Sequence, residues 1–153
     1  MLGSFHSVLT KAEAHAKEKG EDVNSYLELR LAPDMLPLTA QVRIATDMAK
    51  GCVARLAGDE PVKLEDGEAT FADLIARVRK VIGIVEGYKA AQIDGSEGRD
   101  VVLKSPRGDM NFKGLAYLQG FVLPNVYFHV TTTYNILRHN GVEVGKRDFL
   151  GAN

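Results

Sequence analysis

The chain has 153 residues, about the length of one ordinary domain, so we expect a single domain over residues 1–153. Hydrophobic residues make up 45% and charged residues 25%, which is typical of a globular protein. The net charge of −1 gives no electrostatic basis for binding nucleic acid or an anionic membrane surface. There is no apolar run long enough for a membrane span, no signal-peptide pattern and a single cysteine, so a cytoplasmic location is expected.

The first predicted helix covers residues 4–19 and ends at Gly20. Its apolar residues recur at steps of three and four, which places them on one helical face: Phe5, Val8, Leu9, Ala12 and Ala16. A non-helical stretch with Pro33 and Pro37 follows. Because each proline fixes its φ angle and lacks an N–H donor, this stretch is expected to form a rigid elbow.

The second predicted helix covers residues 37–57, with proline tolerated in its first turn and Gly58 as its C-terminal stop. Its apolar stripe consists of Leu38, Val42, Ala45, Ala49, Cys52, Val53 and Leu56. A buried thiol in apolar surroundings is inert, so a packing role is favoured for Cys52 over a nucleophilic one.

The third predicted helix begins at Thr70, because Asp73 three residues later completes an approximate capping box. Its buried face is expected to contain Phe71, Leu74, Ile75, Val78, Ile82 and Val85. Arg77, Arg79 and Lys80 are placed mostly on the other side, which predicts a solvated, charged face.

The helical period is lost between the third and fourth helices. Residues 99–104 and 109–113 flank the turn-rich segment 105–108, which predicts a hairpin. Because a lone hairpin is only marginally stable, it is expected to lie on the helices. The last helical region covers residues 114–139, and Pro124 is expected to kink or split it.

The tail after Gly141 carries an apolar residue every few positions. These residues are Val142, Val144, Phe149 and Leu150. A solvated tail would not need them, so we expect the tail to dock onto the helices.

Segments spread over nearly the whole chain match a known family: residues 31–38 with Gln41 and Val42, residues 54–58, Thr70, Phe71 and Leu74, Pro124 and Asn125, Phe128 and His129, Tyr134, and the closing LRHNGV-x-x-GK-x-DFLG of residues 137–151. On these residues the chain resembles the DinB-like (DinB/YfiT-like) metalloenzyme superfamily, and within it an uncharacterised domain-of-unknown-function family. The helical pattern predicts an all-α four-helix bundle with a small hairpin between its third and fourth helices, and the resemblance implies that the helices run up-down-down-up.

The metal chemistry of that superfamily transfers poorly to this chain. Members with a metal usually carry one histidine on the second helix and two spaced by four on the last, but here the residue four after His129 is Thr133. A weaker set for zinc or nickel is His129 with Asp47, together with Asp34 on the elbow. The alternative for Asp47 is an exposed ion pair with Arg43, one helical turn away.

His129 is nevertheless the leading candidate for a functional residue. It lies beside the apolar stripe of the last helix, where partial burial can shift its pKa and make it an acid or a base. The alternative is a histidine at the edge of the core that is hydrogen-bonded to a neighbour. Tyr134 and Arg138, four residues apart, could complete a catalytic site by binding a carboxylate or phosphate. Arg138 is also explained by its place at a helix C-terminus.

Two functions of different classes remain open. The first is a ligand-binding or non-catalytic bundle that has lost the three-histidine metal site and takes a small-molecule ligand. The second is a metal-dependent enzyme of the thiol transferase or isomerase type that uses His129. The resemblance to the superfamily favours a homodimer. A face of small residues on the second helix could pack on the partner subunit, and the alternative is that it packs against the hairpin or the elbow of the same chain; it consists of Ala40, Asp47, Gly51 and Ala54 beside Ile44.

Overall fold

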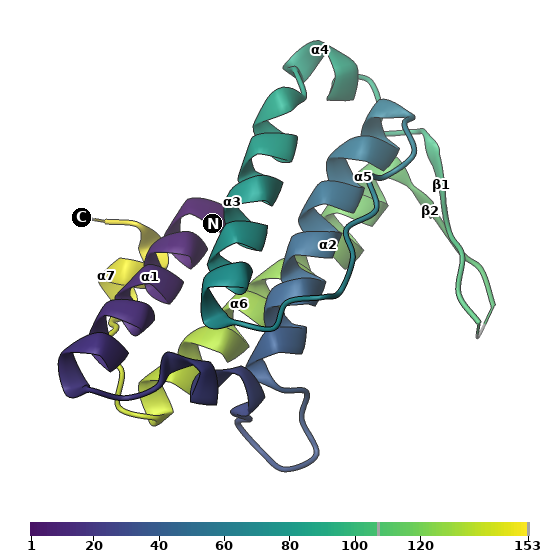
Figure 1. Ribbon diagram of the computed structural model, residues 1–153. Helices are drawn as coiled ribbons and strands as arrows, with labels where there is room; N and C mark the ends of the chain where they lie inside the picture. The colour runs from purple at the N-terminus through teal and green to yellow at the C-terminus, as the bar shows by residue number, and fades with distance from the viewer. Residues whose placement is uncertain (107, 153) are drawn as a thin grey trace.

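The computed structural model describes residues 1–106 and 108–152. It is an all-α bundle with one small antiparallel hairpin, as predicted (Figure 1). No helix in the described part of the chain is both long and apolar enough to cross a membrane. The elements are α1 (Leu2–Lys19), the 3-10 helix η1 (Val23–Glu28), α2 (Leu38–Ala57), α3 (Phe71–Gly87), α4 (Ala90–Ile93), β1 (Asp100–Leu103), β2 (Met110–Lys113), α5 (Gly114–Tyr117), the π-helical turn η2 (Leu118–Val122), α6 (Leu123–His139) and α7 (Lys146–Leu150).

The long helices α1, α2, α3 and α6 enclose the hydrophobic core. α2 packs against both α3 and α6, and α1 packs against α3. The linker of residues 58–70 returns along α2 before α3 begins, so α2 and α3 run in the same direction (Figure 1). The fully buried side chains of the core include Phe5, Leu9, Leu38, Val42, Phe71, Leu74, Ile136 and Leu137.

The predicted helix ends are confirmed. Gly20 and Gly58 end α1 and α2 with φ angles of 69° and 86°, a left-handed conformation that glycine adopts without strain. At the start of α3, the Thr70 hydroxyl accepts a hydrogen bond from the Asp73 N–H, and the Asp73 carboxylate accepts one from the Thr70 N–H at 2.8 Å. This is the reciprocal capping box that the sequence indicated.

The elbow is tied to the helices on either side of it. η1, which the sequence did not predict, occupies its first part. The Leu38 N–H donates to the Leu29 carbonyl at 2.9 Å, and the Thr39 hydroxyl donates to the Leu27 carbonyl at 2.9 Å. The amide oxygen of Asn24 accepts from the Phe71 N–H at 2.9 Å, which joins η1 to the start of α3.

The predicted hairpin is confirmed. β1 and β2 pair from Asp100 opposite Lys113 to Leu103 opposite Met110. Val101 and Leu103 are buried and Val102 is exposed, so the strand alternates between the helices and solvent. Within the predicted turn, Arg107 lies outside the described residues.

Pro124 does not split the last helix. Instead, η2 forms a π-helical turn directly before α6, and Leu123 keeps helical angles of φ −59° and ψ −47°. Pro124 is the second residue of α6, where a missing N–H is tolerated best. The expected irregularity is therefore present, but it is a widened turn ahead of the proline.

The tail docks onto the bundle, although not through every predicted residue. Val142 and Val144 are buried, and the half-buried Phe149 packs edge-on against Tyr134 with ring centroids 6.0 Å apart. Leu150 is 60% exposed, so its predicted burial was wrong. It is the last residue of the short helix α7, which packs on α1 and turns this side chain to solvent.

Candidate functional site

His129 lies on α6 where this helix packs against α2, and it is only 9% exposed. Its Nδ1 is 2.6 Å from Oε1 of Gln41, whose Nε2 donates to the Leu36 carbonyl at 3.0 Å. Because the amide oxygen faces Nδ1, the ring is a donor there and Nδ1 carries the proton. Burial lowers the pKa of His129, which favours the neutral imidazole.

The other two predicted catalytic residues have partners of their own. The Tyr134 hydroxyl donates to the Val144 carbonyl at 3.5 Å, so this side chain is engaged with the docked tail. Arg138 is exposed in the last turn of α6, where a cation is favoured by the helix dipole. A joint anion site of Tyr134 and Arg138 stays a prediction, and it would require the tyrosine to leave Val144.

The structure does not bring together the weaker metal set either. His129 contacts an uncharged amide, Asp34 is exposed on the elbow, and Asp47 belongs to a separate cluster of charges. Within residues 1–106 and 108–152, no three histidine, cysteine, aspartate or glutamate side chains are grouped so that they could hold a metal ion. The donor set around His129 therefore does not suit a divalent ion.

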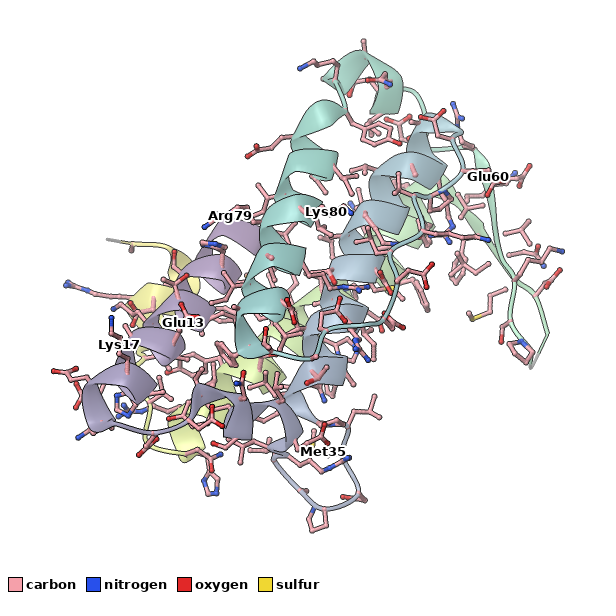
Figure 2. All side chains as sticks on the ribbon, in the orientation of Figure 1. Glu13, Lys17, Met35, Glu60, Arg79 and Lys80 are labelled. Atoms are coloured by element: carbon pink, nitrogen blue, oxygen red, sulfur yellow. The ribbon has the colours of Figure 1, made fainter. Side chains whose placement is uncertain are left out.

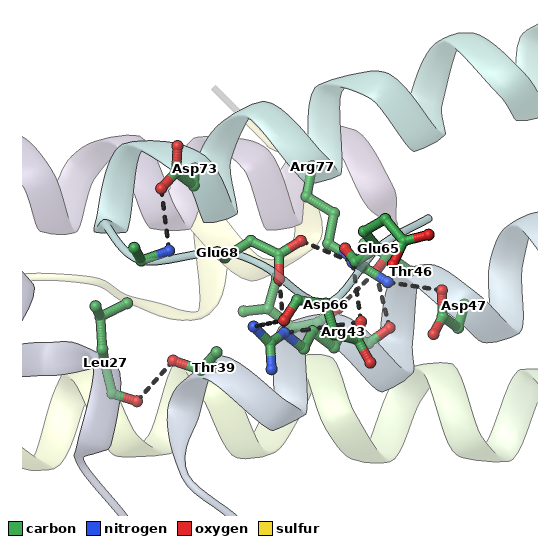
Figure 3. A network of polar contacts seen from close by, with 12 residues as sticks. Leu27, Thr39, Arg43, Thr46, Asp47, Glu65, Asp66, Glu68, Asp73 and Arg77 are labelled. Atoms are coloured by element: carbon green, nitrogen blue, oxygen red, sulfur yellow. Dashed lines mark hydrogen bonds and ion pairs between the residues drawn. The ribbon is translucent and has the colours of Figure 1, made fainter. Parts of the chain in front are cut away.

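Arg77 is the main site residue that the sequence prediction misplaced. It was expected on the solvated face of α3, but it is 4% exposed and points into the space between α3, α2 and the linker (Figure 3). Its guanidinium donates to Asp47 at 2.8 Å and to Glu68 at 2.7 Å, and lies 3.2 Å from an Asp66 carboxylate oxygen. Further hydrogen bonds reach the Thr46 hydroxyl and the Glu65 carbonyl. We call this group the Arg77 cluster.

Arg43 extends the Arg77 cluster along α2. It donates to Glu68 at 2.6 Å and to the Asp66 carbonyl at 3.0 Å, so it does not form the predicted pair with Asp47. Asp47 is paired with Arg77 and, at 3.1 Å, with Lys50. Burial alone would raise the pKa of Glu68, but the hydrogen bonds from Arg77 and Arg43 hold it below its usual value.

The same contacts affect Arg77 itself. Burial by itself would lower the pKa of this guanidinium, but the hydrogen bond to Glu68 and the charges of Asp47 and Glu68 raise it above its usual value. The Arg77 cluster is therefore a set of mutually satisfied charges that fastens the linker to α2 and α3. The carboxylates of Asp66 and Glu68 were the sequence signal that could have revealed it.

Cys52 is buried in α2, as its place in the apolar stripe predicted. Burial raises the pKa of its thiol to about 11. Because the thiolate is the reactive form, Cys52 is a poor nucleophile at neutral pH.

A pocket of about 340 Å³ lies between α2, the hairpin and η2. We call it the hairpin pocket. Its lining combines three cations and one carboxylate with apolar and aromatic side chains: Asp47, Met48, Lys50, Gly51, Arg55, Pro61, Leu103, Lys104, Met110, Tyr117 and Phe121. A second hollow of about 460 Å³ lies along the linker, but Glu68 and Arg77 in its wall already bind each other.

Arg55 is the unusual charge of the hairpin pocket. Its Nη1 donates to the Tyr117 hydroxyl at 3.1 Å, and it forms no ion pair with any carboxylate in the described part of the chain. Gly51 makes this position possible, because a Cβ there would lie 2.4 Å from the same nitrogen. The glycine thus leaves room for the guanidinium to lie back over α2 toward the pocket.

Aromatic rings form the wall of the hairpin pocket opposite α2. Tyr117 and Phe121 are stacked with centroids 6.1 Å apart, and Phe112 of β2 contacts both at 5.8 and 5.2 Å. Phe121 belongs to η2, so the π-helical turn helps to set the position of this wall. Such turns are found frequently at functional sites.

Comparison with known proteins identifies the family. A family model described as a domain of unknown function, DUF1993, matches residues 1–150. The chain belongs to the DUF1993 family. It is also similar to a crystal structure of a DinB family member protein from Shewanella denitrificans, with 41% sequence identity and a TM-score of 0.89 over 100% of this chain and 86% of the other. A comparison with curated proteins gave no match. The predicted resemblance to a DinB-like domain-of-unknown-function family is thereby confirmed.

Proposed function

We propose that this DUF1993 protein is a non-catalytic binding protein that holds a small organic anion in the hairpin pocket. The observation that carries the proposal is Arg55, a cation that faces a pocket and has a tyrosine hydroxyl, not a carboxylate, as its described partner. A guanidinium that is not neutralised by the protein is available to bind a carboxylate.

The remaining lining supports an amphipathic ligand. Lys50 and Lys104 add positive charge, partly offset by their partners Asp47 and Asp109. Met48, Leu103 and Met110 supply apolar contact, and the stacked Tyr117 and Phe121 supply aromatic surface. Pockets of about 300–1,000 Å³ with apolar walls and a few convergent polar groups are typical small-molecule sites. An aromatic or aliphatic carboxylate combines both features.

The titratable groups outside this pocket favour binding over catalysis. In the described part of the chain, the His129 ring is hydrogen-bonded to the uncharged amide of Gln41, and the pKa of the Cys52 thiol is raised to about 11. An acid–base enzyme needs a titratable group within hydrogen-bond reach of its substrate, and a thiol enzyme needs a cysteine whose pKa is lowered. We therefore propose that the three-histidine metal site of the superfamily is lost in this chain.

Ligand binding is tested by thermal unfolding and calorimetry with benzoate, phenylacetate, hexanoate and inorganic phosphate. Benzyl alcohol serves as the uncharged control ligand. A carboxylate at one hundred times its dissociation constant should stabilise the fold by about 2.7 kcal/mol. Arg55→Gln should abolish this effect, whereas Arg79→Gln, which changes an exposed arginine of α3, should not. The absence of any stabilising carboxylate, or equal stabilisation of Arg55→Gln, would contradict the proposal.

The loss of the metal site is tested separately by elemental analysis. Protein purified without added metal should carry well under one equivalent of zinc or nickel. Stoichiometric metal that survives dialysis against a chelator and disappears in His129→Ala would favour the metal-dependent enzyme instead.

A further inference from the structure

The residues of α5, η2 and α6 up to Leu137 include no charged side chain. No aspartate, glutamate, lysine or arginine stands between Lys113 and Arg138, although a quarter of the whole chain is charged. Exposed positions recur at every fourth residue of this stretch, with Phe128 beside them: Leu115, Gln119, Leu123, Tyr127, Phe128 and Thr131. We call these residues the uncharged face.

Large side chains dominate the uncharged face. Tyr127 is 48% and Phe128 56% exposed, and Leu123 lies one turn before Tyr127. The outer faces of α1 and α3 differ, because Lys17 projects from α1 and Arg79 and Lys80 project from α3 (Figure 2). Aromatic enrichment with depletion of charge is the composition of the centre of a protein–protein interface.

We propose that the uncharged face is the contact surface between two copies of this chain. In a two-fold symmetric dimer the same patch meets itself, so any charge near the axis would face its own like charge. A surface without charges avoids this repulsion and buries no ion. Nothing in its side chains opposes self-association, and the exposed rings supply the apolar area that stabilises it.

Other occupants would require charges that the uncharged face lacks. A membrane-surface helix combines exposed apolar residues with lysine and arginine on its polar side, and nucleic acid requires cations for its phosphates. A different protein partner is usually selected through complementary charges. With none present, a second copy, which is always available at the same concentration, is the occupant that the surface suits best.

This location replaces the face on α2 that the small residues suggested. Gly51 and Ala54 are buried within the chain, and Asp47 is engaged by Arg77. The end of that face at Gly51 and Ala54 is therefore covered by the protein itself, whereas Ala40 and Ile44 are half-buried. The dimer expected from the sequence is better placed on α6.

The test is light scattering of the full chain during size-exclusion chromatography, over a wide dilution range. The wild type should have a mass near twice 16.7 kDa. Phe128→Glu should raise the dissociation constant by about tenfold or more, because the loss of a central aromatic contact typically costs over 1 kcal/mol. Val62→Glu is the matched control: Val62 is 49% exposed but belongs to the linker, and its variant should remain dimeric.

Tyr127→Gln is a second variant, which introduces no charge and should also raise the dissociation constant of the dimer. Circular dichroism checks that each variant is folded. A wild type that is monomeric at every concentration overturns the proposal. A dimer that survives both α6 variants, or one that dissociates in Val62→Glu alone, overturns the assigned surface.

Discussion

The two sides of α2 are held by different kinds of interaction. On the side of α3 and the linker, Arg77 and Arg43 bind the carboxylates of Asp47, Asp66 and Glu68 (Figure 3). On the side of α6, many buried residues are apolar, and the hydrogen bond between side chains of the two helices in the described part of the chain is the neutral one between His129 and Gln41. The difference arises because one side of α2 positions the irregular linker and the other side positions a regular helix.

A helix such as α6 is positioned by the packing of its apolar stripe, but the linker has no regular apolar stripe that could pack in this way. Residues 58–70 must return along the bundle without regular structure. Their carboxylates and carbonyls are bound at defined points by two arginines, whose donors have a fixed, planar geometry. Directional bonds thus set the path of the linker, whereas packing sets the path of the helix.

The largest expected effect is on the charged side. Arg77→Ala should destabilise the protein by roughly 3–5 kcal/mol, because it removes the charged hydrogen bonds to Asp47 and Glu68, each worth about 1.5–3 kcal/mol. Lys50 and Arg43 remain as the only other partners of these two carboxylates in the described part of the chain. Urea unfolding measures the change. Arg77→Lys should recover only part of the loss, since an ammonium group cannot reproduce the several directional bonds of the guanidinium.

Arg79→Ala is the matched control for this experiment. It removes the same side chain type from the exposed side of α3, two residues away, and should change stability by less than about 0.5 kcal/mol. Equal effects of the two substitutions would show that the Arg77 cluster contributes little and would remove the contrast between the two sides of α2.

The second prediction concerns the apolar side, which the tail completes. Removing residues 142–153 exposes the core surface that Val142 and Val144 cover, and each buried valine contributes about 1.5 kcal/mol, the lower end of the range for apolar side chains. The melting temperature should fall by several degrees, as measured by calorimetry. Leu150→Ser is the control and should leave it unchanged, because this side chain is largely exposed. An unaltered melting curve after truncation would show that the tail does not stabilise the core.

The sequence predicted the fold well wherever one local rule was sufficient. Apolar periodicity gave the long helices, Gly20 and Gly58 gave two helix ends, and Thr70 with Asp73 gave the capping box. Each of these signals depends on residues within a few positions of one another, so no knowledge of the tertiary structure was needed.

The candidate site was harder to predict because its contacts join distant segments. Arg77 follows Leu74 by three residues and precedes Val81 by four, at the edge of the apolar stripe. The linker of residues 58–70 covers the Arg77 side chain as it returns along α2, and the path of the linker cannot be predicted from helical spacing. The hairpin pocket similarly depends on Arg55 meeting Tyr117 across the fold.

The smallest expected effect is on the pH dependence of stability, and it tests whether His129, on the α6 side of α2, must be neutral in the folded protein. The pKa of His129 is lowered by burial from an unfolded value of about 6.5, so the unfolded state takes up a proton more readily than the folded state. The stability that depends on a neutral His129 is therefore complete above about pH 6.5 and is lost as the pH falls through the folded pKa. Glu68, on the charged side, also has a lowered pKa, and its contribution is lost only below the carboxylate value of 4.5.

The two sides of α2 should thus respond in separate pH windows. In urea unfolding followed as a function of pH, His129→Gln should flatten the decline that begins near pH 6.5 and leave the decline below pH 4.5 in place. His139→Gln, at the exposed end of α6, should reproduce the wild-type curve. If His129→Gln and the wild type lose stability in parallel from pH 6.5 downward, His129 accepts a proton in the folded state as readily as in the unfolded one. The α6 side would then tolerate a buried charge, and the distinction drawn between the two sides of α2 would fail at this residue.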